Sequence, residues 1–190
     1  MRGFRRRIVL TTIAGGLFAG CVGDRLDHDD DVPHPLDNAD DKNGAIDTAA
    51  IESFVESSSA TLSHGKDVFE TWLDSPDETD LQTIDELRSA STSLLNRFDS
   101  DIWPYRDAIS DHEPGDEMDG EEWPADGGAL MEALSAHETL ILEIEEATIG
   151  ILDADGSREV TDANAIEAAE LVVEEAAGVI ADAESALHPP

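Results

Sequence analysis

Four long segments of the 190-residue chain repeat apolar residues at steps of three and four, and this spacing constrains the fold more than any other feature. The segments span about 45–73, 75–103, 129–152 and 162–187. Such steps place side chains on one face of an α-helix. The residues that share a face are, in chain order, Ile51, Val55, Ser58, Leu62, Gly65, Phe69 and Trp72; Leu81, Ile84, Leu87, Ser91, Leu94 and Phe98; Leu130, Leu134, His137, Ile141, Ile144, Thr148 and Ile151; and Ile166, Ala169, Val173, Ala176, Ile180, Ala183 and Leu187.

The second segment carries the clearest boundary signals. Residues 75–78, Ser-Pro-Asp-Glu, predict a helix start, because they combine a capping serine, proline at the first helical position and acids in the first turn. Pro104 disfavours helix at the residue before it, so this helix is expected to end near Trp103. In the first segment, the serines at 57–59 and Gly65 weaken the helical signal and leave open a break there.

No segment shows strand-like alternation bounded by turn residues, and the expected fold class is therefore all-α. Four amphipathic helices joined by short or medium loops favour an antiparallel four-helix bundle with up-down-up-down topology over residues 45–190. In that topology Trp103 and Trp123 lie at one end and Trp72 lies at the other. We expect all three tryptophans to cap the core.

The first twenty residues have the pattern of an export signal. Four arginines precede residues 8–20, a stretch of 13 uncharged residues. As a helix this stretch would reach about 20 Å, which is short of a hydrocarbon core of about 30 Å. A basic start, a short apolar run and small residues at its end predict a signal peptide over residues 1–20. Arg6 and Arg7 precede apolar residues in the way of a twin-arginine signal.

Phe18-Ala19-Gly20-Cys21 resembles the lipobox of secreted lipoproteins, in which a leucine, a small residue and Gly or Ala precede a cysteine. The resemblance implies that the sulfur of Cys21 receives a lipid and that the chain is cut just before it. Phe18 departs from the usual leucine. Two other interpretations remain open: an uncleaved N-terminal anchor, or an ordinary signal peptide with an incidental cysteine. Cys21 is the only cysteine, so it has no partner for an internal disulfide.

Residues 21–44 follow with eight aspartates, two prolines and few apolar residues, which is typical of a disordered acidic tether. We expect this tether to separate a membrane-held Cys21 from the helical domain. It would join that domain at the Trp103 and Trp123 end, which would make this the membrane-proximal end.

Acidic residues dominate the whole chain. There are 45 Asp and Glu against 11 Lys and Arg, and removing residues 1–20 leaves seven basic residues and a net charge of −38. High acid content with only two lysines resembles the proteins of extreme halophiles. An acidic disordered protein is the alternative, and the periodic apolar residues argue against it. The absence of a basic patch disfavours nucleic acid as a partner.

Catalytic motifs do not emerge from the sequence. It holds no Gly-x-Ser-x-Gly elbow, no His-Glu-x-x-His pair and no Gly-rich phosphate loop. Neither His64 nor His137 has a glutamate three residues earlier, as a di-iron bundle needs. We therefore expect no catalytic residues, no metal site and no cofactor, and a protein that is not an enzyme.

Two features could still bind a ligand. Residues 111–122 hold seven carboxylates in a loop with two glycines, which could bind a hard cation, but charge runs are usually solvated. His137 lies on an apolar helix face, where a hydrogen-bonded core histidine is the commoner outcome than a ligand or a proton-transfer group.

The sequence thus predicts a lipid-anchored helical protein on the extracellular side of the cell membrane. It would act as a non-enzymatic binding or cell-envelope module attached through Cys21, with another envelope protein as its candidate partner. The alternative is a surface lipoprotein that binds a metal or small ligand through the 111–122 loop or a pocket around His137.

Overall fold

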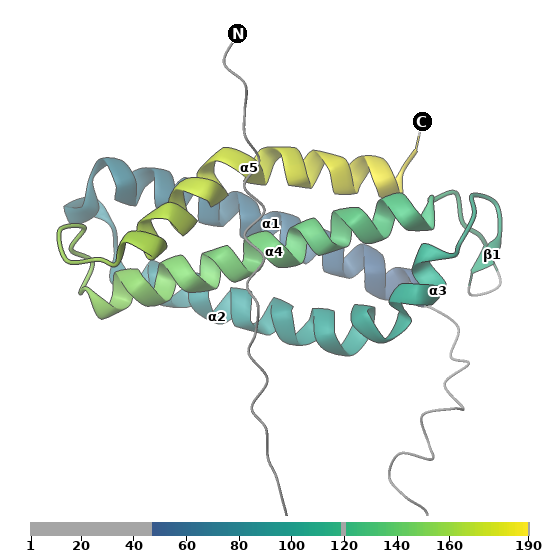
Figure 1. Ribbon diagram of the computed structural model, residues 1–190, viewed down its shortest axis with the longest axis horizontal. Coiled ribbons are helices and arrows are strands. Elements are labelled where there is room, and N and C mark those ends of the chain that lie inside the picture. The colour runs from purple at the N-terminus through teal and green to yellow at the C-terminus, as the bar shows by residue number, and fades with distance from the viewer. Residues whose placement is uncertain (1–46, 119–120, 190) are drawn as a thin grey trace, which may run out of the picture. The chain divides into compact units, whose positions relative to one another are not determined.

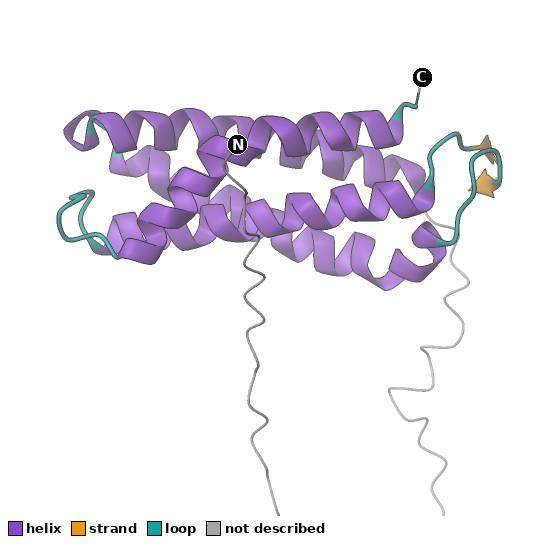
Figure 2. Cartoon of the chain, turned by 45° about the horizontal axis from the view of Figure 1, so that its top comes forward, coloured by secondary structure: helices purple, strands orange, loops and turns teal. Residues whose placement is uncertain are grey.

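Four long helices make up most of the computed structural model, which describes residues 47–118 and 121–189. They are α1 (Thr48–Asp74), α2 (Leu81–Arg97), α4 (Gly127–Asp153) and α5 (Ala163–Leu187). A one-turn helix, α3 (Arg106–Ser110), lies between α2 and α4. The prediction of a mostly helical chain with four long helices is confirmed (Figures 1 and 2).

The long helices lie side by side (Figure 1). Helix α1 contacts the other three, and α4 packs against both α2 and α5. The short α3 packs against α4. Among residues 47–118 and 121–189, none of the helices contains a membrane-spanning apolar segment.

Each long helix begins after an aspartate whose carboxylate accepts a hydrogen bond from a first-turn backbone N–H. These caps are Asp47, Asp80, Asp126 and Asp162. Such caps satisfy backbone donors that have no partner within the helix. The prediction that Ser75 caps the second helix is wrong. Ser75 ends α1, Pro76–Glu78 forms a 3₁₀ turn, and the helical register restarts at Asp80.

The second helix also ends differently from the prediction. The α-helix stops at Arg97 and continues as a π-helical turn, Phe98–Ile102, and a 3₁₀ turn, Trp103–Tyr105, before α3. Pro104 is tolerated because it lies in the first turn of the 3₁₀ segment, where its missing N–H is not needed. The helical backbone therefore runs past the proline.

A small hairpin that the sequence did not predict lies between α3 and α4. Strands β1 (Glu117–Met118) and β2 (Glu121–Glu122) pair antiparallel, with Glu117 opposite Glu122. Next to them, the N–H of Gly115 donates to the carbonyl of Trp123, and the N–H of Trp123 donates to the carbonyl of Asp116.

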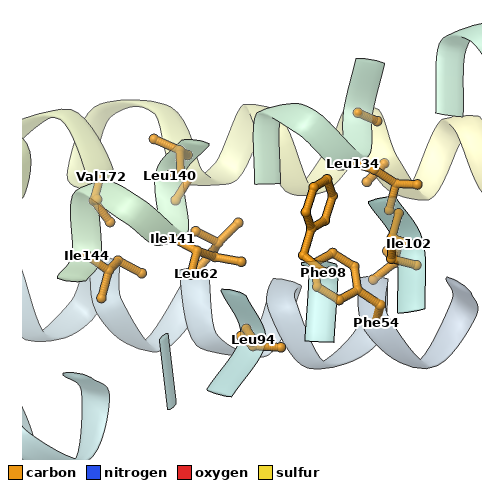
Figure 3. Close-up of a cluster of buried hydrophobic side chains, with 14 of the residues drawn as sticks. Phe54, Leu62, Leu94, Phe98, Ile102, Leu134, Leu140, Ile141, Ile144 and Val172 are labelled. Atoms are coloured by element: carbon orange, nitrogen blue, oxygen red, sulfur yellow. The ribbon is translucent and has the colours of Figure 1, made fainter. Parts of the chain in front are cut away.

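The apolar faces predicted for the first and third helices are buried throughout. Figure 3 shows part of this core, with Leu62 of α1 near Ile141 and Ile144 of α4. Phe54 and Phe98 join α1 to the end of α2, with ring centroids 5.7 Å apart. The face predicted for the fourth helix is partly wrong. Ile166, Val173 and Ile180 are only half-buried. The face of α5 that is buried instead consists mainly of small residues. That face is Ala165, Ala168, Ala169, Val172, Ala176, Ala183 and Leu187.

Small residues explain why α5 buries this face rather than the predicted one. A Cβ at Gly150 of α4 would lie 2.3 Å from the Cβ of Ala165, so the two helices meet where neither carries a large side chain. In α1, no break occurs between Ser57 and Gly65. The hydroxyl of Ser57 donates to the Ser53 carbonyl one turn back. Gly65 makes room for Ile144, whose Cδ1 would lie 2.9 Å from an added Cβ.

Two of the three tryptophans are buried. The Nε1–H of Trp72 donates to the carbonyl of Gly156 at 3.0 Å, and Trp123 packs against His112 with ring centroids 5.6 Å apart. Trp103 remains 47% exposed. The expectation that all three cap the core is therefore wrong for Trp103, because the π-helical turn places its neighbours Phe98 and Ile102 in the core instead.

Candidate functional site

The residues that the sequence singles out for export and lipidation lie outside the described residues. They are Arg6, Arg7, Phe18, Ala19, Gly20 and Cys21, and the acidic segment that follows them lies outside as well. These assignments stay predictions. A site of the helical domain has to come from the side chains of α1 to α5.

The strongest side-chain constellation surrounds His137. Its imidazole, on α4, is fully buried. Nδ1 lies 2.7 Å from Oγ of Ser58 on α1, whose side chain is also fully buried. Nε2 lies 3.3 Å from the carbonyl oxygen of Val179 on α5. One ring therefore bridges three helices.

The partners of His137 fix where its proton sits. A carbonyl oxygen can only accept, so Nε2 carries the proton that is donated to Val179. The hydroxyl of Ser58 then donates to the unprotonated Nδ1. Burial lowers the pKa of His137 below its ordinary value of 6.5, and the bond to the Val179 carbonyl offsets part of that shift. The neutral ring is the form that this environment favours.

A serine hydroxyl hydrogen-bonded to an imidazole has the distance expected of a nucleophile and its general base. Neither Ser58 nor His137 exposes surface, however, so a substrate cannot reach the hydroxyl in this conformation. What the arrangement does is satisfy two buried polar side chains and hold three helices in register. The interpretation of His137 as a hydrogen-bonded core residue is confirmed.

Sequence reasoning placed Ser58 on the apolar face of the first helix but did not pair it with His137. The signal in the sequence was that a serine and a histidine, both polar, occupy positions on otherwise apolar helix faces. Two such exceptions that lie on facing helices can satisfy one another.

The acidic loop after α3 does not gather its carboxylates into a site. Asp111, Glu113, Asp116 and Glu117 are exposed, and the Asp116 carboxylate accepts from the backbone N–H of Glu113 at 3.3 Å. Within residues 47–118 and 121–189, no three His, Cys, Asp or Glu side chains are placed to hold a metal ion.

Two open surface hollows carry acidic rims. One, of about 640 Å³, lies between α1 and the end of α5 and is lined by Glu52, Val55, Glu56, Ser59, Glu184, Leu187 and His188. The other, of about 470 Å³, includes Asp126, Glu132 and Asp182 of the α4 and α5 side. Both would favour cationic groups and repel anions.

Carboxylates on α4 show the effect of crowding by acids. The pKa of Glu138 is raised by partial burial and by the charge of Asp99. The pKa of Glu143 is raised by partial burial and by Glu146 and Glu167. The few ion pairs among the described residues, such as Lys66 with Glu70 at 2.7 Å, lie on the surface and contribute little.

Comparison of this chain with protein-family models, with curated proteins and with solved structures gave no match.

Proposed function

We propose that this chain is a lipid-anchored extracytoplasmic helical protein that acts as a non-enzymatic binding or cell-envelope module. One observation carries the proposal: the sole cysteine, Cys21, follows Phe18-Ala19-Gly20 at the end of a short uncharged run that begins after Arg6-Arg7. The order of a basic start, a short apolar run and a lipobox-like end supports export, cleavage before Cys21 and lipidation of its sulfur.

The proposed organisation has three parts. Residues 1–20 are a signal peptide, residues 21–44 are the lipidated cysteine and a disordered acidic tether, and residues 45–190 are a helical bundle domain. An antiparallel, up-down-up-down order of the four long helices is supported by the contacts of α1 with α2 and of α4 with α5, since helices that follow one another and pack together usually run in opposite directions.

A non-enzymatic role is supported by the burial of Ser58 and His137, a pair with the geometry of a nucleophile and its base that no substrate reaches in this conformation. Placement on the outer side of the cell membrane follows from the proposed export signal. The excess of acidic residues supports a salt-rich medium, in which repulsion between carboxylates is screened. The same charge favours a cationic partner over nucleic acid.

The test is to follow the protein between membrane and medium in cells. Cys21→Ser should release the protein into the medium or leave uncleaved precursor, and Phe18→Leu, which restores the usual lipobox residue, should be processed at least as well as the parent. Ser63→Ala, an exposed change on α1, is the matched control and should leave the membrane fraction unchanged. A cleaved Cys21→Ser protein that stays in the membrane fraction would contradict the anchor.

The second candidate is a surface lipoprotein that binds a metal or a small ligand. The hollow between α1 and α5 favours it, because Glu52, Glu56 and Glu184 rim a volume of about 640 Å³. Calorimetry with Ca²⁺, Mn²⁺ and Zn²⁺ in molar KCl tests the metal. A saturable heat of binding that is smaller for Glu56→Gln than for the parent would support this candidate. The absence of a saturable heat would rule out binding of these metal ions.

A further inference from the structure

An exposed aromatic corner follows the π-helical turn at the end of α2. It consists of Trp103, Pro104, Tyr105 and Arg106, which leads into α3 (Figure 1). Trp103 and Pro104 are exposed, whereas Tyr105 and Arg106 are half-buried. The corner stands out because Trp72 and Trp123 are buried.

The exposed ring of Trp103 is held in place. Its centroid lies 6.3 Å from that of buried Phe98. The guanidinium carbon of Arg106 lies 4.5 Å from the Trp103 ring centroid, and Nη1 of Arg106 donates to the Trp103 carbonyl at 3.2 Å. A cation over an indole face is attracted by the ring, so the corner presents a fixed pair rather than two independent side chains.

The corner lies in a stretch of low net charge. Residues 97–110 hold two arginines against three aspartates, whereas the rest of residues 47–190 holds three basic residues against 34 acidic ones. An anionic lipid surface attracts basic and repels acidic groups, so residues 97–110 themselves would repel it only weakly.

The corner is close to the point where α1 begins. Phe98 packs against Phe54 in the second turn of α1, and Nη2 of Arg97 lies 3.4 Å from Oγ of Ser53. Asp47, which caps α1, follows Cys21 by 26 residues. A chain of that length spans at most about 90 Å, so a lipid on Cys21 would keep this part of the molecule within reach of the bilayer.

Tryptophan is enriched at membrane–water interfaces, where its ring is apolar and its N–H can reach water or a headgroup. Arginine beside it can bond a lipid phosphate. We propose that Trp103, with Arg106 over its ring, contacts the bilayer interface when the chain is held at a membrane through Cys21; this inference rests on the lipid anchor proposed above.

The test couples the full chain to vesicles without the cell's own lipidation. Cys21 is the only thiol, so it reacts at one place with a maleimide headgroup in phosphatidylcholine vesicles. Acyl chains that carry bromine quench a tryptophan that enters the interface. In about 2 M KCl, where repulsion is screened, we expect the tryptophan emission of the parent to be quenched and that of Trp103→Phe to lose about nine-tenths of this quenching.

The control places a tryptophan near the C-terminal end of α1, a helix about 40 Å long whose N-terminal end lies near the corner. Val160 is 71% exposed in the connection between α4 and α5, close to Gly156, which bonds Trp72. The double variant Trp103→Phe with Val160→Trp keeps three tryptophans, and we expect it to show no more quenching than Trp103→Phe alone.

Equal quenching of the parent and Trp103→Phe, no quenching of the parent, or quenching of the Val160→Trp protein at the parent's level would each overturn the contact. Because the link to the vesicle is chemical, these outcomes do not depend on whether cells lipidate Cys21. Suppose that cleaved Cys21→Ser stays in the membrane fraction of cells while the vesicle-coupled parent is still quenched. That result would contradict the native lipid anchor but not the contact of the corner with the bilayer.

Discussion

Oγ of Ser58 lies 2.7 Å from Nδ1 of His137, and these two side chains, 79 residues apart in the chain, join α1 to α4 within an apolar core. The same ring reaches Val179 of α5. Apolar contacts between helices tolerate small slides along the axis, whereas a hydrogen bond does not. We therefore assign this bridge the role of fixing the axial register of three helices.

The neutral state of His137 makes the stability of the fold depend on pH. Its pKa is lowered in the folded protein, so its contribution is fully present above the unfolded value of 6.5 and is lost as the pH falls toward the folded value. Between pH 7.5 and 5.5, the free energy of unfolding of the parent should fall relative to that of His137→Gln, by at most about 1.4 kcal/mol per pH unit.

Denaturant unfolding in concentrated KCl measures this difference at each pH. The comparison with His137→Gln is needed because Glu138 and Glu143, whose pKa values are raised, shift stability in the opposite direction on acidification. Parallel pH profiles of the two proteins would mean that the pKa of His137 is the same in the folded and unfolded states, which would contradict the lowered pKa.

Removing the hydroxyl of Ser58 should leave Nδ1 of His137 buried without a partner. Ser58→Ala is expected to lower the free energy of unfolding by about 1–3 kcal/mol. Ser63→Ala, on the exposed side of the same helix, should be neutral or slightly stabilising because alanine is the better helix former. Chemical unfolding followed by circular dichroism gives both free energies of unfolding. Equal values for the two variants would contradict a stabilising Ser58–His137 hydrogen bond.

Two glycines at helix contacts should not tolerate a methyl group. An added Cβ would lie 1.7 Å from the carbonyl oxygen of Ile109 at Gly127 and 2.3 Å from the Cβ of Ala165 at Gly150. Gly127→Ala and Gly150→Ala should each cost about 1–3 kcal/mol, although alanine favours helix. At Gly178 nothing lies within 4 Å of such a Cβ, so Gly178→Ala should stabilise α5 by about 0.5–1 kcal/mol. Thermal unfolding orders the three variants.

Salt should decide whether the helical domain stays folded. Residues 47–190 carry 37 acidic and five basic residues, and the Debye length shortens from about 10 Å at 0.1 M salt to about 3 Å at 1 M. The far-UV circular dichroism signal should be strongly helical at about 2 M KCl and should weaken below about 0.2 M. A spectrum that does not change over this range would mean that repulsion between carboxylates is unimportant.

The periodicity of the sequence predicted the four long helices and most of their buried faces, because burial of one face imposes the spacing. Local rules failed where two signals competed. Ser75-Pro76 has the chemistry of a helix start, but Asp80 is the cap that α2 uses. On α5, periodicity could not choose between neighbouring faces, since the approach of Gly150 to Ala165 decides which face is buried.

The candidate site was predictable only in part. A histidine on an apolar face indicates a buried polar group, but spacing along one helix says nothing about the axial level of its neighbour. The pairing of His137 with Ser58 is therefore a tertiary property. The exposure of Trp103 likewise depends on a π-helical turn for which the sequence carries no simple pattern.

Lipid attachment at Cys21 underlies the proposed location and role of the protein, and the mass of the chain purified from its native membrane tests it most directly. We predict a polypeptide that begins at Cys21 and is heavier than residues 21–190 by the mass of a lipid in thioether linkage. A chain that still begins at Met1, or a Cys21 with a free thiol, would contradict the anchor.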